Sequence, residues 1–171
     1  MADLGRSAKM HQYRVTKYDP ALRDAAGAYT KEDWTSFSDI GRSCGSATLT
    51  EEDYVRVESS YIDIAKKFLA EDGCPTLRAV GFENRAGFAE APTEGALISE
   101  KDLPVVCRSI LREEFWCRLE ADGRFLHFGY DYYMYVGVKS ECPTSIAAAA
   151  TVGLFVERYE SPYFETKQGR S

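Results

Sequence analysis

The stretch FWCRLEADGRFLHFGYDYYMYVGV, residues 115–138, decides the fold of this chain. Asp122 and Gly123 separate two runs in which apolar residues alternate with polar ones, and such an Asp-Gly pair is typical of a two-residue β-hairpin turn. A turn centred on these residues fixes the register of the hairpin and gives it one apolar face. The pairs predicted on that face are Leu119 with Leu126 and Cys117 with Phe128.

The opposite face of the hairpin carries polar and aromatic side chains. In the same register Arg118 lies opposite His127, and Trp116 lies opposite Gly129. The strand period of two predicts an apolar face that continues with Leu126, Phe128, Tyr130, Tyr132, Met134, Val136 and Val138. It also predicts a contact face made of Trp116, Arg118, His127, Asp131, Tyr133 and Tyr135. The alternative is that these aromatic side chains lie under a helix as a second core layer.

The remaining elements follow from capping residues and periodicity. Residues 12–18 alternate as a strand, and Thr50 is a suitable N-cap for a helix over residues 51–71. Further segments are predicted in this order: a strand over 76–82, a helix that Ser99 caps, the hairpin, a helix over 143–152 and a strand over 154–159. This order predicts a single α+β domain over residues 10–166, with a mixed or mainly antiparallel sheet and helices mainly on one face. Residues 1–9 are interpreted as a leader and residues 167–171 as a polar tail.

A long loop, residues 19–45, carries large aromatic side chains without regular periodicity. We expect Trp34 and Phe37 to be substantially buried, because several exposed aromatic side chains in one loop are unfavourable. Long ordered loops are frequently functional, so Trp34 and Asp39 are candidate binding residues. The alternative is an irregular cover over the sheet in which Asp39 satisfies local backbone groups.

Composition excludes several classes of protein. The formal charge of −6 over 171 residues argues against a nucleic-acid binder. It suits a protein partner with a basic surface, but the more common explanation is that a net charge of this size keeps a small domain soluble. The five cysteines are widely spaced without a histidine cluster, so neither a metal site nor a cofactor is predicted. No apolar run reaches the length of a membrane span, and a cytoplasmic location is expected.

Four motifs carry a resemblance to a family of small, uncharacterised bacterial proteins. They are YRVTKYDP at residues 13–20, WTSFSDIG at 34–41, LREEFWC at 111–117 and HFGYDYYMYVG at 127–137. The resemblance spans most of residues 12–163 and implies a bacterial cytoplasmic protein, without a mechanism. A looser similarity to the immunity proteins of bacterial toxin systems lies in size, acidity and aromatic content.

Three functional hypotheses follow. The leading one is a protein-binding domain, of the toxin-neutralising immunity type, with aromatic anchors and acidic residues that meet a basic partner. The second is a small hydrolase or nuclease-like enzyme in which His127 is the general base. The supporting residues in that case are Asp131 or Glu114 as orienting or acid groups, Arg118 or Arg112 for an anion, and Tyr133 for developing charge. The third is a small-molecule-binding regulatory module with an aromatic pocket beneath the Trp34 loop.

Overall fold

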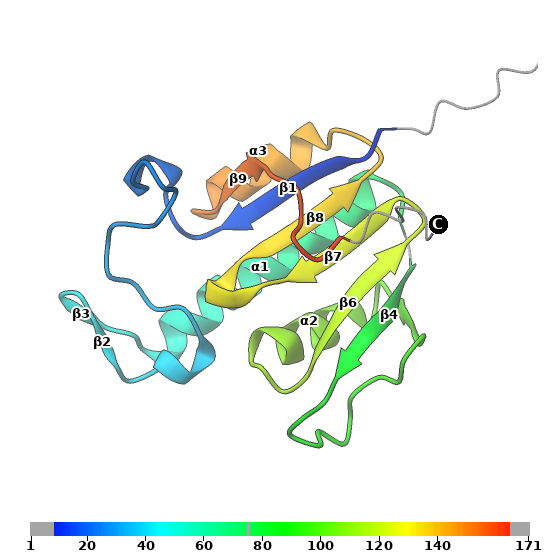
Figure 1. The fold of residues 1–171 in the computed structure, drawn as a ribbon, viewed down its shortest axis with the longest axis horizontal. Helices are drawn as coiled ribbons and strands as arrows, with labels where there is room; N and C mark the ends of the chain where they lie inside the picture. The colour runs from blue at the N-terminus through cyan, green and yellow to red at the C-terminus, as the bar shows by residue number, and fades with distance from the viewer. Residues whose placement is uncertain (1–8, 75, 165–171) are drawn as a thin grey trace, which may run out of the picture.

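Seven antiparallel strands form the main sheet of the protein (Figure 1), which we describe from a computed structural model over residues 9–74 and 76–164. The strand order across the sheet is β5-β4-β6-β7-β8-β1-β9. In chain order the strands are β1 (His11–Thr16), β4 (Thr76–Glu83), β5 (Leu97–Ser99), β6 (Trp116–Ala121), β7 (Arg124–Phe128), β8 (Met134–Val138) and β9 (Phe155–Arg158). The strand pairs within this sheet are antiparallel, so the predicted α+β class with a mainly antiparallel sheet is confirmed.

The α-helices of the described residues pack on one face of this sheet, and Figure 1 shows the longest of them running behind β7 and β8. They are α1 (Glu51–Glu71), α2 (Leu103–Leu111) and α3 (Pro143–Thr151). Thr50 caps α1 as predicted, because its hydroxyl accepts a hydrogen bond from the backbone N–H of Asp53 at 3.1 Å. The helix that Ser99 was predicted to cap, with a start near Glu100 or Lys101, begins later, at Leu103, with Asp102 as its N-cap.

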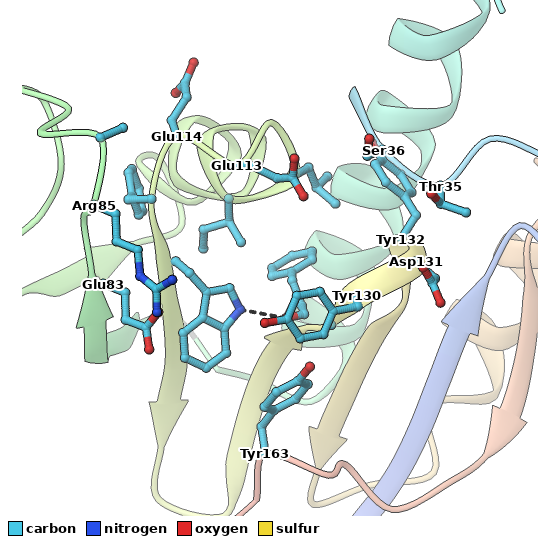
Figure 2. Close-up of a pocket in the computed structure, with 17 residues that line it drawn as sticks. Thr35, Ser36, Glu83, Arg85, Glu113, Glu114, Tyr130, Asp131, Tyr132 and Tyr163 are labelled. Atoms are coloured by element: carbon cyan, nitrogen blue, oxygen red, sulfur yellow. Dashed lines mark hydrogen bonds and ion pairs between the residues drawn. The ribbon is translucent and has the colours of Figure 1, made fainter. Parts of the chain in front are cut away.

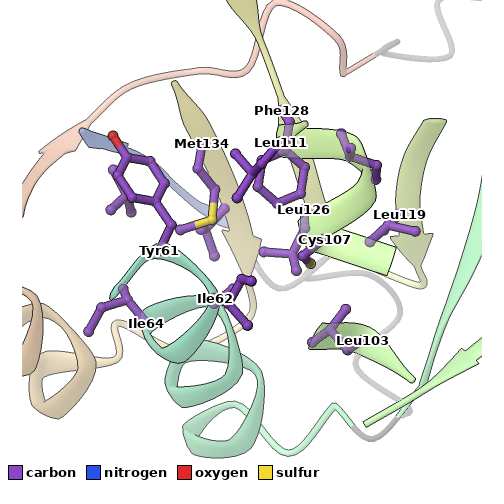
Figure 3. Packing of buried hydrophobic residues seen from close by; sticks show 14 of the residues in the cluster. Tyr61, Ile62, Ile64, Leu103, Cys107, Leu111, Leu119, Leu126, Phe128 and Met134 are labelled. Carbon is purple, nitrogen blue, oxygen red and sulfur yellow. The ribbon is translucent and has the colours of Figure 1, made fainter. Parts of the chain in front are cut away.

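The core lies between the helices and the sheet (Figure 3). Tyr61 and Ile62 of α1 and Cys107 of α2 face Leu126 of β7 and Met134 of β8 there. All five side chains are at most 4% exposed, so the stripe of apolar residues on each helix is core, as its spacing predicts.

The central hairpin has the predicted register. Leu119 pairs with Leu126 and Ala121 with Arg124, so the turn falls on residues 122–123, where Gly123 has a φ of +66°. The paired residues of this hairpin run from Ala121–Arg124 to Leu119–Leu126. The predicted pairs Cys117 with Phe128 and Arg118 with His127 have the same register but lie beyond the last paired residues, so they stay a prediction.

The expectation of one continuous strand beyond Phe128 is wrong. Strand β7 ends at Phe128, a short 3-10 turn (η3, Tyr130–Tyr132) follows, and β8 begins at Met134 as the antiparallel neighbour of β7. Tyr130 was predicted on the apolar face, but it lies in this turn and its side chain is 85% exposed. Tyr132 does enter the core.

The loop over residues 19–45 is a packed cover. It contains the 3-10 turns η1 (Pro20–Leu22) and η2 (Phe37–Asp39), and it leads into a small hairpin, β2 (Ser43–Cys44) and β3 (Ala47–Thr48), that was not predicted. Trp34 is buried and Phe37 is partly buried, which confirms the expectation for both. Their rings lie 5.4 and 5.1 Å from the ring of Tyr54, so the loop is anchored on α1.

The sheet face opposite the helices is partly covered by the chain itself. After β9, the segment over residues 159–164, which we name the C-terminal strap, passes in front of β8 and β7 (Figure 1). Backbone and side-chain hydrogen bonds from Tyr159 and Ser161 to Gln12 tie its beginning to β1. Of the predicted leader only Lys9 lies within the described residues, and the predicted tail lies outside them.

Candidate functional site

A pocket of about 390 Å³ opens where α2 ends and the β7–β8 turn begins (Figure 2). Several segments far apart in the sequence build its walls. Glu113 and Glu114 form one side, while Tyr130 and Tyr163 stand on the opposite side. The complete lining is Thr35, Ser36, Glu83, Arg85, Ala86, Ile110, Leu111, Glu113, Glu114, Phe115, Trp116, Phe128, Gly129, Tyr130, Asp131, Tyr132 and Tyr163.

Aromatic side chains give the pocket a rigid lining. The indole N–H of Trp116 donates a hydrogen bond to the carbonyl of Phe128 at 2.8 Å, and its ring lies 5.4 Å from that of Tyr163. Gly129 permits this arrangement, because a Cβ at that position would lie 3.2 Å from the Tyr163 hydroxyl and 3.0 Å from the Tyr135 ring. The strap therefore contributes one wall of the pocket through Tyr163.

The turn at the mouth of the pocket has a strained backbone. Asp131 and Tyr132 have φ angles of 60° and 64°, a left-handed conformation that side chains other than glycine rarely adopt. Burial of Tyr132 holds the turn in place: its hydroxyl donates to the Tyr54 hydroxyl at 3.0 Å, and its carbonyl accepts from the Tyr61 hydroxyl at 2.9 Å. These contacts hold the backbone of the turn that carries the exposed Tyr130.

The acidic side of the pocket begins at the C-terminus of α2. The N–H of Glu113 donates to the carbonyl of Ile110, and that of Glu114 donates to Ser109, both at 3.0 Å. This is a Schellman motif, in which the residue at the place of Glu113 is usually glycine. Glu113 has a φ of 61° there. Two carboxylates at the negative end of a helix are also electrostatically unfavourable.

Ion pairs with a buried carboxylate fix the end of α2. Glu58 of α1 is 1% exposed and accepts hydrogen bonds from Arg112 at 2.8 and 3.0 Å and from Arg108 at 3.1 Å. These contacts raise the pKa of the Arg112 guanidinium, first through its hydrogen bond to Glu58. Arg112, a candidate anion-binding group in the enzyme hypothesis, is therefore already engaged by a carboxylate.

His127 does not reach the pocket. It is fully buried beneath the strap, with Nδ1 2.7 Å from the Ser161 hydroxyl and Nε2 3.0 Å from a Glu120 carboxylate oxygen. Burial, with a smaller contribution from nearby Arg118, lowers the pKa of His127 to about 3. The order serine, histidine, carboxylate resembles a nucleophile relay, but Ser161 is itself buried and does not line the pocket.

The other candidate residues of this face are divided between two places. Arg118 donates to the Tyr163 carbonyl at 3.2 Å and lies 3.4 Å from Glu120, so it fastens the strap. Tyr135 is buried nearby, and burial raises its pKa to about 12. Tyr133 lies at the β1 side of the sheet, where its hydroxyl accepts from Arg23 at 3.0 Å.

The candidate binding residues of the long loop, Trp34 and Asp39, have structural roles. Asp39 accepts hydrogen bonds from the N–H groups of Thr35 and Ser36 at 2.9 and 3.2 Å, which is the local role that the alternative interpretation gave it. Trp34 is buried against α1. Of the predicted binding residues, only Trp116 and Asp131 line the pocket.

The sequence interpretation missed several residues of this region: Tyr130 and Glu113 as pocket residues, Tyr163 in the strap, and Ser161 and Glu120 around His127. One signal was present for Glu113, because an acidic pair directly after a helix opposes the helix dipole. Nothing comparable marks Tyr163, which reaches the pocket only through the path of the strap.

Comparisons with known proteins add no relative. No family model matches the chain, and neither a curated protein nor a solved structure matches it significantly. Within residues 9–74 and 76–164, no helix has the length and apolar character needed to cross a membrane. In the same described residues, no group of three or more His, Cys, Asp or Glu side chains is placed to hold a metal ion.

Proposed function

We propose that the protein is a protein-binding domain and that the pocket, with Tyr130 at its mouth, is the contact site. The observation that carries the proposal is the 85% exposure of Tyr130 on a turn that is fixed from below. Tyrosine is a frequent anchor in protein interfaces, since its large ring loses little conformational entropy on binding. An exposed anchor on a rigid base is preorganised to bind.

The surroundings of Tyr130 support the proposal. Trp116 and Tyr163 place aromatic surface directly beside it, and such residues are enriched at the centre of interfaces. The carboxylates on the other side of the pocket suit a partner with a basic surface. The left-handed backbone at Asp131 and Tyr132 reduces stability, and strained residues of this kind concentrate at functional sites.

The narrower form of the proposal is a bacterial, cytoplasmic immunity-type protein that neutralises a toxin. The acidic pocket supports it, since a basic toxin would meet complementary charge there. The enzyme hypothesis has less support, because both ring nitrogens of His127 already have partners and the ring is inaccessible.

The proposal is tested by affinity capture from the native cell with the wild-type protein and the Tyr130→Ala variant. We expect a specific partner whose affinity falls by about 30-fold or more in the variant, the effect of losing an anchor worth about 2 kcal/mol. Leu97→Ala is the matched control, because Leu97 is 63% exposed on β5 and does not line the pocket. Equal affinity of all three proteins for every captured partner would disprove the proposed site.

The toxin-neutralising role has its own test. The captured partner is expressed in bacteria alone, with the wild-type protein, and with Tyr130→Ala. Growth arrest by the partner alone and rescue only by the wild type are expected. A partner that leaves growth unaffected would exclude the immunity role without affecting the binding site.

A further inference from the structure

We propose that the pocket receives one cationic side chain, arginine or lysine, which the partner inserts between the carboxylates and the aromatic rings. This inference deepens the proposed function and rests on it for the claim that the ligand belongs to a protein. The site is the cavity of about 390 Å³ itself, a size in the range of small-ligand pockets. It suits a single long side chain better than a folded element.

The charges of the lining select a cation. Four acidic residues line the pocket, Glu83, Glu113, Glu114 and Asp131, against a single basic residue, Arg85. Arg85 lies 3.6 Å from Glu83, so this acid is already paired. Within residues 9–74 and 76–164, no ion pair or side-chain hydrogen bond engages the carboxylate of Glu113, Glu114 or Asp131. An anionic ligand such as a phosphate would be repelled here.

The aromatic rings add a second attraction for the same kind of ligand. A cation held over an aromatic face gains about 0.5–2 kcal/mol, and tryptophan is the most favourable ring. Elsewhere the chain uses this contact itself: Arg14 lies 4.0 Å from the ring centre of Tyr159, and Lys17 lies 4.0 Å from that of Trp34. In the described part of the chain, no cation–π contact involves Trp116, Tyr130 or Tyr163.

The proposal is tested by titrating the isotope-labelled full chain with N-acetyl-arginine amide, N-acetyl-lysine amide and N-acetyl-citrulline amide at constant ionic strength. Citrulline has nearly the shape of arginine without its charge. The readout is the indole N–H resonance of Trp116, assigned with a Trp34→Phe variant, and the Trp34 resonance serves as internal control. We expect saturable shifts of the Trp116 signal with the two cationic amides and at least tenfold weaker binding of the citrulline amide.

Charge variants test the acidic side of the pocket. Glu113→Gln with Glu114→Gln should weaken binding of N-acetyl-arginine amide about five- to tenfold, because two nearby opposite charges are lost. Glu100→Gln is the control, since Glu100 is exposed outside this pocket. Higher salt should weaken binding to the wild type more than to the double variant.

The outcomes separate this inference from the proposed function. Binding of the citrulline amide as tight as that of the arginine amide, or no loss in the double variant, overturns the cationic selectivity. If no amide binds but Tyr130→Ala still loses affinity for the captured partner, the proposed protein-binding site is supported and the inference of an inserted cationic side chain is wrong. If the arginine amide binds as expected but Tyr130→Ala keeps its affinity for every captured protein, the pocket binds a cation and the proposed protein-binding site is wrong.

Discussion

The hydroxyl of Ser161 lies 2.7 Å from Nδ1 of His127, and this contact joins the C-terminal strap to the middle of the sheet. Nε2 lies 3.0 Å from Glu120, and a carboxylate only accepts hydrogen bonds, so we assign the imidazole proton to Nε2. Nδ1 of the neutral ring then accepts from Ser161. The Ser161 oxygen in turn accepts a hydrogen bond from the N–H of Tyr163 at 3.2 Å. This bond connects the contact between Ser161 and His127 to the wall of the pocket that Tyr163 forms.

Ser161→Ala should loosen the strap. The substitution removes the donor to a fully buried nitrogen and the acceptor of the Tyr163 N–H, so the free energy of unfolding should fall by about 1–2 kcal/mol. Urea unfolding measures the total loss, and hydrogen exchange of the amides in residues 159–164 locates it. Ser46→Ala is the control, because Ser46 is exposed in the β2–β3 turn. Unchanged protection of the strap in Ser161→Ala would show that the hydrogen bond does not hold it.

The buried imidazole should make stability depend on pH. Burial lowers the pKa of His127 from its ordinary 6.5 to about 3, so the unfolded chain binds a proton that the folded chain refuses between these values. The stabilising contribution of the neutral ring is complete above pH 6.5 and is lost as the pH falls toward 3.

A comparison of the wild type with His127→Gln isolates this contribution from the carboxylates that titrate in the same range. Glutamine keeps one donor and one acceptor but does not ionise in this range. The free energy of unfolding of the wild type, measured between pH 7 and 4, should therefore fall more steeply than that of the variant. Parallel curves for the two proteins would contradict the lowered pKa of His127.

Gly137→Ala should displace the C-terminal strap by pushing the Phe125 ring against it. Gly137 is paired with Phe125 across the sheet, and a Cβ at residue 137 would overlap the Phe125 ring. That ring is stacked 4.1 Å from His127 and 5.2 Å from Phe164, so it cannot move without disturbing the strap. We expect a loss of about 1–3 kcal/mol in the free energy of unfolding, the usual effect of overpacking a core.

The matched control for overpacking is Gly27→Ala. Gly27 has a φ of +84° and no neighbouring atom within 4 Å of an added Cβ, so only backbone strain of about 1 kcal/mol is expected. Hydrogen exchange in residues 159–164 should increase in Gly137→Ala and stay unchanged in Gly27→Ala. Equal exchange in the two variants would argue against coupling between Phe125 and the strap.

The elements that could be predicted are those specified by neighbouring residues. The Asp-Gly turn at residues 122–123 determined the register of the hairpin, and Thr50 marked the beginning of α1. The second turn could not be predicted, because Asp131 and Tyr132 are not the Asn-Gly type of pair that normally adopts left-handed backbone. Tertiary contacts of Tyr132 with Tyr54 and Tyr61 hold that turn.

The candidate site was only partly predictable for a related reason. Strand alternation placed Trp116 and His127 on one face, but alternation does not reveal what covers that face. The cover is the strap, whose contacts join residues separated by 34 positions, from Ser161 to His127, and by 45, from Tyr163 to Arg118. The strap buries His127, and the pocket is lined instead by residues that include Tyr130, Glu113 and Glu114.

Glu113→Gly should stabilise the protein while weakening its binding site. Glycine adopts the left-handed conformation at residue 113 without a steric penalty and is the usual residue in this Schellman motif, so the free energy of unfolding should rise by about 1 kcal/mol. Loss of a carboxylate at the C-terminus of α2 adds a smaller favourable contribution. The same change removes one of the unpaired acids from the pocket and should weaken binding of N-acetyl-arginine amide by about three- to fivefold.

Glu113→Gln separates the two effects, because it removes the charge and keeps the strained backbone. It should weaken binding of the arginine amide as much as Glu113→Gly does but recover only the smaller electrostatic part of the stability, about 0.3 kcal/mol or more. Thermal unfolding and the titration of the Trp116 resonance measure the two quantities on the same samples. A Glu113→Gly variant that binds the amide as tightly as the wild type would show that the carboxylate of Glu113 does not contribute to cation binding.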